Sequence, residues 1–114
     1  MSLLLQAIDA SFSALIIIDK KGVIVESSNV SVELFGYSKS EIIGLEVDKL
    51  IPKTHKQEMK EYFQAFYRDP ELRKLKKRRV ITAIKKNESE IKAEIDITSF
   101  EENKEIYCVV NIVD

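Results

Sequence analysis

The sequence has 114 residues, 45% of them hydrophobic and 32% charged, with a formal net charge of −1. This length fits a single globular domain that buries roughly 65% of the surface of its unfolded chain, and the balanced charge gives no global field that would attract nucleic acid or an anionic membrane. No apolar stretch approaches the ~20 residues of a membrane-spanning helix, and the N-terminus lacks a signal-peptide pattern. The single cysteine excludes an internal disulfide. Together these features predict a cytoplasmic domain without membrane contact.

Residues 1–12 form a predicted amphipathic helix in front of a core of residues 13–114. Leu4, Ala7 and Ile8 recur at nearly helical spacing, so this helix has an apolar stripe that must be covered. Either the back of the domain's own sheet or a second copy of the chain would cover it. These three residues are therefore candidates for a dimer interface.

Two strands joined by a tight turn are predicted next. The run from Leu15 to Ile18 is rich in β-branched residues, which is typical of a strand that is buried on both faces. Asp19-Lys20-Lys21-Gly22 predicts the tight turn, and Val23-Ile24-Val25 returns as the second strand.

After the second strand the sequence predicts two very short helices. Asn29 is a suitable N-cap for the first, and Gly36 ends it, because glycine adopts a left-handed conformation at little cost. Ser38 and Glu41 have the spacing of a capping box for the second helix, which Gly44 ends. Helices this short are not stable alone, so we expect them to pack against the sheet and to wall a cavity there.

One longer helix is predicted to begin at Thr54. A short helical turn over Val47–Ile51 precedes it, and Thr54 with Gln57 has the spacing of a second capping box. Apolar residues then recur with the helical period and give the helix one apolar side, made of Met59, Tyr62, Phe63, Phe66 and Tyr67. Pro70 follows its end.

The last third of the chain predicts a turn at Lys86-Asn87-Glu88 and three antiparallel strands, over residues 80–84, 90–98 and 106–113. The last strand is apolar on both sides, and its second apolar face, formed by Tyr107, Val109 and Val113, needs a cover. Two strands, a helical segment and three more strands predict an α+β fold with the helices on one face of the sheet.

The order and spacing of these motifs resemble the signature of PAS sensory domains. In that family an asparagine opens the first short helix, a Gly-Tyr-Ser/Thr segment follows, and a Glu-apolar-apolar-Gly segment ends the second helix; the matching residues are Asn29, Gly36-Tyr37-Ser38 and Glu41-Ile42-Ile43-Gly44. The resemblance extends from about Leu4 to Asp114. It implies a PAS-like five-stranded antiparallel sheet with short helices and one longer helix on one face, plus residues 1–12 as an N-terminal cap helix.

The resemblance also implies a ligand pocket between the helices and the sheet. Tyr37 and Tyr62 carry phenols that need partners if they are buried, so they are the better candidates to orient a ligand. The aromatic residues of the long helix also fit a second interpretation, ordinary core packing. The candidate pocket residues are Phe35, Tyr37, Met59, Tyr62, Phe63, Phe66, Ile81, Ile95 and Val110.

Neither haem nor flavin is predicted. Some oxygen-sensing PAS domains bind haem through a histidine of the long helix, but that position corresponds to Met59 here, and the only histidine, His55, fits a surface position. Light-sensing relatives carry an Asn-Cys-Arg-Phe segment where this chain has Gly44-Leu45-Glu46-Val47, and redox flavin relatives use tryptophan, which this sequence lacks. One histidine and one cysteine do not suffice for a metal site. Binding of an unidentified small ligand stays possible on the sequence alone.

The basic run Arg73–Arg79 has two interpretations, a solvated loop or a contact with an acidic linker or partner. The near-neutral net charge and the lack of supporting aromatic residues argue against nucleic acid as a partner. The sequence has no Ser-His-Asp arrangement, no P-loop and no glycine-rich nucleotide turn, so the domain itself is not predicted to be an enzyme.

We therefore expect a module of a bacterial signalling protein that regulates a covalently linked effector, a sensor histidine kinase or a diguanylate cyclase, through small-ligand binding or rearrangement of a homodimer. Val113 and Asp114 match the family's closing strand and are the expected signal exit, although Val113 replaces the arginine that often precedes the aspartate. One alternative is a ligand-free dimerisation module that uses the N-terminal helix with Tyr107 and Val109; another is a small enzyme of similar shape. A chain that ends directly after an apolar strand is expected to be one domain of a longer protein.

Overall fold

Five strands form one antiparallel sheet in the part of the chain that the structure describes. The structure is a computed structural model that describes residues 13–68 and 79–113, with the backbone alone for Tyr62, Phe66 and Arg79. The strand order is β2-β1-β5-β4-β3. The strands are β1 (Ala14–Ile18), β2 (Ile24–Ser27), β3 (Arg79–Ile84), β4 (Glu90–Glu102) and β5 (Glu105–Val113). The predicted N-terminal helix lies outside the described residues.

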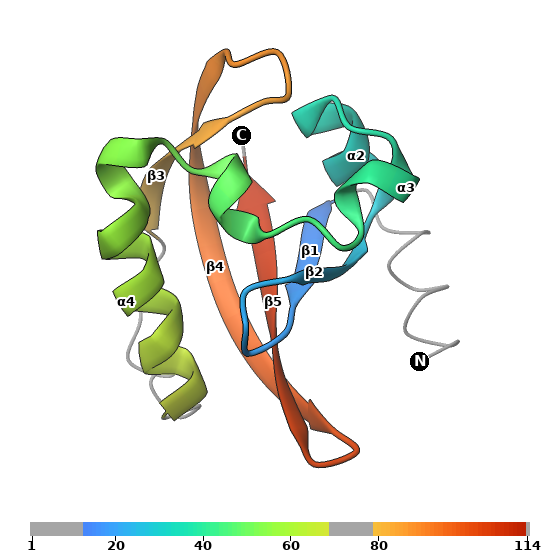
Figure 1. The fold of residues 1–114 in the computed structure, drawn as a ribbon, viewed down its shortest axis with the longest axis vertical. Helices are drawn as coiled ribbons and strands as arrows, with labels where there is room; N and C mark the ends of the chain where they lie inside the picture. The colour runs from blue at the N-terminus through green and yellow to red at the C-terminus, as the bar shows by residue number, and fades with distance from the viewer. Residues whose placement is uncertain (1–12, 69–78, 114) are drawn as a thin grey trace.

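The described helical segments cover one face of this sheet. Figure 1 shows α4 beside β3, and α2 and α3 on the side of β1 and β2. α2 packs against β1, α3 against β2 and α4 against β5, while η1 contacts β3. The segments are α2 (Asn29–Phe35), α3 (Lys39–Ile42), the 3-10 turns η1 (Val47–Leu50) and η2 (Lys53–His55), and α4 (Lys56–Arg68). The predicted α+β fold, with helices on one face, is confirmed.

Period-two alternation directs apolar side chains toward the helices. In β4, Ala93 and Ile95 are buried, whereas Glu94 and Asp96 are exposed. The buried side chains of the helices meet this inner face and complete one core, whose larger members include Ile16, Ile18, Phe35, Ile42, Leu50, Met59, Phe63, Ile97, Val110 and Ile112.

The N-cap of α2 is Ser28, so the prediction of Asn29 as the N-cap is wrong. Ser28 has an extended backbone (φ −72°, ψ 161°), and its Oγ accepts a hydrogen bond from the Ser31 N–H at 3.2 Å. The same oxygen accepts from Leu15 N at 2.9 Å and donates to the Ser13 carbonyl at 2.9 Å. Because these contacts tie Ser28 to β1, Ser28 is the cap and Asn29 is the first residue of the helix. The helix therefore begins one residue earlier than predicted.

The predicted capping box at Thr54 is also wrong. The Pro52 carbonyl accepts from the His55 N–H at 2.9 Å, and the residues between them form the 3-10 turn η2. Thr54 therefore lies inside this turn, where its hydroxyl hydrogen-bonds with His55 Nδ1 at 3.0 Å, and α4 starts at Lys56. By contrast, the capping box between Ser38 and Glu41 is confirmed, with both reciprocal hydrogen bonds formed.

Candidate functional site

A small apolar cavity lies inside the core, between the inner face of the sheet and the helical segments. Its volume is about 30 Å³. Four strands, the end of α2, the 3-10 turn η1 and α4 contribute to its wall, so it touches every layer of the domain. It is lined by Ile16, Phe35, Val47, Leu50, Ile51, Met59, Phe63, Ile81, Ala83, Ala93, Ile95, Val110 and Ile112.

Most of the predicted pocket residues whose side chains are described line this cavity. They are Phe35, Met59, Phe63, Ile81, Ile95 and Val110. Tyr37 does not line it: this side chain packs at the edge of the core, with Lys86 Nζ 5.9 Å from the centre of its ring. The side chains of Tyr62 and Phe66 lie outside the described part of the structure. Whether any of these residues binds a ligand stays a prediction.

Sequence reasoning missed the two alanines of the wall, which make the hollow. Ala83 and Ala93 point inward from β3 and β4, at positions where the neighbouring inward residues are isoleucines. Alanine is depleted in strands because it packs little surface. Two alanines at inward strand positions were therefore a readable signal for space in the core. The remaining residues missed are Ile16, Val47, Leu50, Ile51 and Ile112.

The wall offers no polar side chain to a ligand. Every described side chain that lines the cavity is hydrophobic, and Met59, Phe63 and Ile95 are each less than a tenth exposed. Pockets for cofactor-sized molecules are roughly 300–1,000 Å³ and contain a few placed polar groups. Haem and flavin therefore do not fit this cavity as it stands, and its chemistry is limited to dispersion contacts with apolar atoms.

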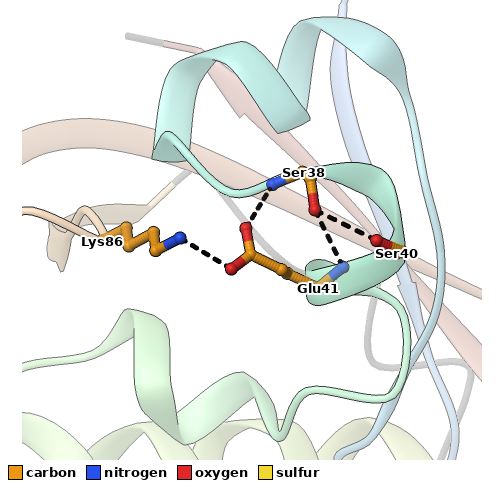
Figure 2. Close-up of polar contacts among 4 residues, drawn as sticks. All are labelled: Ser38, Ser40, Glu41 and Lys86. Atoms are coloured by element: carbon orange, nitrogen blue, oxygen red, sulfur yellow. Dashed lines mark hydrogen bonds and ion pairs between the residues drawn. The ribbon is translucent and has the colours of Figure 1, made fainter.

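A polar network joins the β3–β4 turn to the two short helices (Figure 2). Lys86 Nζ donates to Glu41 Oε2 at 2.6 Å, and Glu41 Oε1 accepts from the Ser38 N–H at 2.8 Å. The backbone N–H of Lys86 also donates to the Phe35 carbonyl at 2.8 Å. The hydrogen bond from Lys86 and that from the Ser38 backbone lower the pKa of Glu41 from its ordinary 4.5 to about 2. One lysine thus attaches the turn to both α2 and α3.

A second connection links α4 to the β1–β2 turn. The Tyr67 hydroxyl donates to the backbone carbonyl of Asp19, and the side chain of Asp19 accepts from the N–H groups of Lys21 and Val23. Burial raises the pKa of Tyr67, so the hydroxyl keeps its proton. Burial likewise raises the pKa of the neighbouring Cys108 thiol to about 11, an increase that Tyr67 partly offsets. Neither group is placed as a nucleophile.

The outer face of the sheet carries apolar residues as well. Ile17 lies there between Glu26 of β2 and Val109 of β5, and it is fully buried. Glu26 Oε1 and Asn111 Oδ1 are buried polar atoms without a hydrogen-bond partner among the described residues. This face is therefore not a uniformly polar, solvent-exposed surface, which agrees with the apolar residues on both sides of the last strand.

The predicted interface residues are distributed between described and undescribed parts of the chain. Tyr107 and Val109 lie on the outer face and are half-buried, with the Tyr107 ring stacked on Phe100 at 5.4 Å between centroids. Val113, the predicted signal exit, ends β5 and is 40% exposed. The other predicted residues, Leu4, Ala7, Ile8 and Asp114, lie outside the described residues.

Across residues 13–68 and 79–113, no group of three or more histidine, cysteine, aspartate or glutamate side chains is arranged to hold a metal ion. Over the same ranges, no helix combines the length and the apolar character needed to cross a bilayer. The basic run Arg73–Arg79, apart from the backbone of Arg79, lies outside these ranges, so both interpretations of it stay predictions.

Several solved structures share this fold. A PAS domain of an HTR-like protein from Haloarcula marismortui is 17% identical, with a TM-score of 0.78 over 99% of this chain and 89% of that one. A PAS domain from Desulfitobacterium hafniense is 15% identical, with a TM-score of 0.81 over 96% and 98% of the two chains. A domain of a sensory box sensor histidine kinase/response regulator from Geobacter sulfurreducens is 15% identical, with a TM-score of 0.76 over 99% and 93%.

The sequence profile of the PAS domain family matches residues 12–114. This match covers both strands of the first hairpin, the short helices, α4 and the last three strands. The chain belongs to the PAS domain family.

Proposed function

We propose that this domain is a sensory module that regulates a covalently linked effector domain. The observation that supports it is the position of β5: Val110 and Ile112 line the cavity, whereas Val109 and Val113 lie on the opposite face. A ligand or a repacking event that displaced this strand would change both surfaces at once. β5 leads directly to Asp114, so the change would leave the domain there.

A sensor histidine kinase is the effector that we favour, because one of the matched structures is described as a domain of a sensor histidine kinase/response regulator. A diguanylate cyclase is the second candidate and has only the sequence resemblance behind it. In either case the effector carries the catalysis and the domain described here carries none. We place the module in a bacterial cytoplasm.

The test is the effector activity of the full-length protein. Val110→Ala removes two methyl groups from the cavity wall on β5, and we expect it to change that activity severalfold. Val80→Ala is the matched control, because Val80 is 64% exposed and lies outside the cavity wall. If the folded V110A protein has the same effector activity as the V80A protein, the cavity does not control the effector.

The second candidate function is a ligand-free dimerisation module, which the apolar outer face favours. Val109→Glu would place a charge beside the buried Ile17 and should shift a dimer toward monomer in sedimentation analysis. Lys92→Glu, on an exposed position of β4, is the control. A dimer that persists both in V109E and after removal of residues 1–12 would contradict this interface.

A further inference from the structure

The cavity has room for a water molecule but offers it no partner. A buried water needs roughly 10–15 Å³ of free space and about two to four hydrogen-bonding groups. The cavity, at about 30 Å³, meets the first condition. The described wall side chains are all apolar, and the backbone groups of β3, β4 and β5 behind them belong to continuous antiparallel ladders. Apolar cavities of this kind stay dry and accept apolar guests.

From this chemistry we propose that the cavity binds a small, uncharged, apolar ligand of one to a few non-hydrogen atoms. The inference rests on the proposed sensory function and adds the chemical class of the ligand. A polar or charged ligand would give up its hydrogen bonds to water and gain none from the wall. A ring system of cofactor size would require the core to repack, which close-packed interiors resist.

The hollow depends on two small side chains of the sheet. Ala93 lies directly opposite Ile81 on β3, and Ala83 lies opposite Ile91 on β4. Both alanines are 3% exposed and line the cavity. A valine at either position would project two further methyl groups into a space of about 30 Å³. Each substitution should therefore fill the site without altering the outer surface.

Met59 and Ile81 belong to the cavity wall. Both also line a surface groove of about 260 Å³ between α4 and β3, together with His55, Glu58 and Lys92 among others. Methionine has three rotatable bonds and no branch, so it adapts to changes in the volume beside it. The Met59 side chain is therefore the wall residue best able to adjust its shape to a guest in the cavity.

Xenon is the appropriate probe, because it is apolar, uncharged and monatomic. Methyl NMR spectra of the 114-residue chain recorded under increasing xenon pressure should show saturable shifts at Met59, Ile95 and Val110, with an affinity of ~1 mM or weaker, as expected for so few contacting atoms. Ala93→Val should weaken binding at least tenfold. Thr98→Val is the matched control, since it adds an apolar group to the outer face of the same strand.

Ala83→Val supplies an independent variant if A93V does not fold. Saturable shifts in the wild-type and T98V proteins, lost in A93V or A83V, would support the proposal. Linear shifts without saturation, or equal binding by the filled variants, would overturn it. A polar or charged ligand that is retained in native mass spectra and shifts the same methyl groups would overturn the ligand class while leaving the sensory function intact. Unchanged effector output in V110A would instead count against the function.

Discussion

Lys86 Nζ lies 2.6 Å from Glu41 Oε2, across 45 residues of sequence. This ion pair holds the turn between β3 and β4 against the first residues of α3, and the Lys86 backbone holds the same turn against the end of α2. Phe35, whose carbonyl accepts that backbone bond, also lines the cavity. Lys86 thus connects the β3–β4 turn both to α3 and to a residue of the cavity wall.

The pKa of Glu41 should depend on Lys86. In the folded protein it is lowered from 4.5 to about 2, chiefly by the hydrogen bond from Lys86. Because the folded pKa lies below the unfolded one, the contribution of Glu41 to stability is complete above about pH 4.5 and is lost as the pH falls toward 2. Both side chains are about half exposed, so the effect on stability should be small and weaken with salt.

Lys86→Met should raise the pKa of Glu41 by on the order of one unit, as measured by NMR titration of the carboxyl carbon. Lys20→Met is the control, because Lys20 forms an exposed ion pair with Glu105 elsewhere, at 4.0 Å. An unchanged Glu41 titration in K86M would show that the hydrogen bonds with Ser38, and not Lys86, lower the pKa of Glu41.

Substitution by alanine should change the stability of the domain differently at two serines near the start of α2, Ser28 and Ser31. Ser28 caps the helix and bonds to β1, so Ser28→Ala removes a cap and leaves the Leu15 N–H without its partner; we expect a loss of about 2 kcal/mol. Ser31 Oγ is buried without a partner among the described residues. Ser31→Ala should therefore be neutral or stabilising by up to ~1 kcal/mol. Urea unfolding followed by circular dichroism measures both, and equal destabilisation would contradict the assignment.

The sheet and the turns could be predicted from the sequence because local rules control them. The alternating burial along β4 and the turn at Asp19–Gly22 can each be predicted from residues that are close in sequence. The position of the α2 N-cap could not be predicted, because Ser28 and Asn29 are both good caps and the choice depends on a hydrogen bond to Leu15 in another strand. Contacts of this kind are set by tertiary structure.

The cavity itself was predictable only in part. Apolar residues at inward positions were visible in the sequence, but the same pattern describes a filled core, and only the bulk of opposing side chains decides between them. Tyr37 illustrates the limit: it was a candidate to orient a ligand because a buried phenol needs a partner, yet it does not line the cavity, and Lys86 of the β3–β4 turn lies over its ring. That partner is too distant in sequence to be inferred from spacing.

Cys108 should be nearly unreactive in the folded protein. It is fully buried, and burial raises its pKa to about 11 from an ordinary 9.0. Because the thiolate is the reactive form, labelling with a disulfide reagent at pH 8 should be slower than in urea-unfolded protein by about 100-fold or more. As the only cysteine in the sequence, it also reports opening of the core. Rapid labelling without denaturant would contradict the packing of β5 described here.

The β4–β5 turn carries a lysine in a conformation that favours glycine. Asn103 and Lys104 have φ values of 51° and 66° and connect the paired residues Glu102 and Glu105. A two-residue hairpin turn with both φ values positive strongly favours Asn-Gly. Lys104→Gly completes that sequence, and relief of the left-handed lysine should exceed the entropy that glycine adds to the unfolded chain.

We expect Lys104→Gly to stabilise the domain by about 0.5–1 kcal/mol, measured by urea unfolding. Lys21→Gly is the matched control, since Lys21 occupies the β1–β2 turn without a positive φ. There glycine relieves no strain and increases the entropy of the unfolded state, so the variant should be less stable. If both variants change stability in the same direction, the turn at Lys104 is not strained. Opposite signs would show that backbone conformation, and not the loss of a charged side chain, determines the effect.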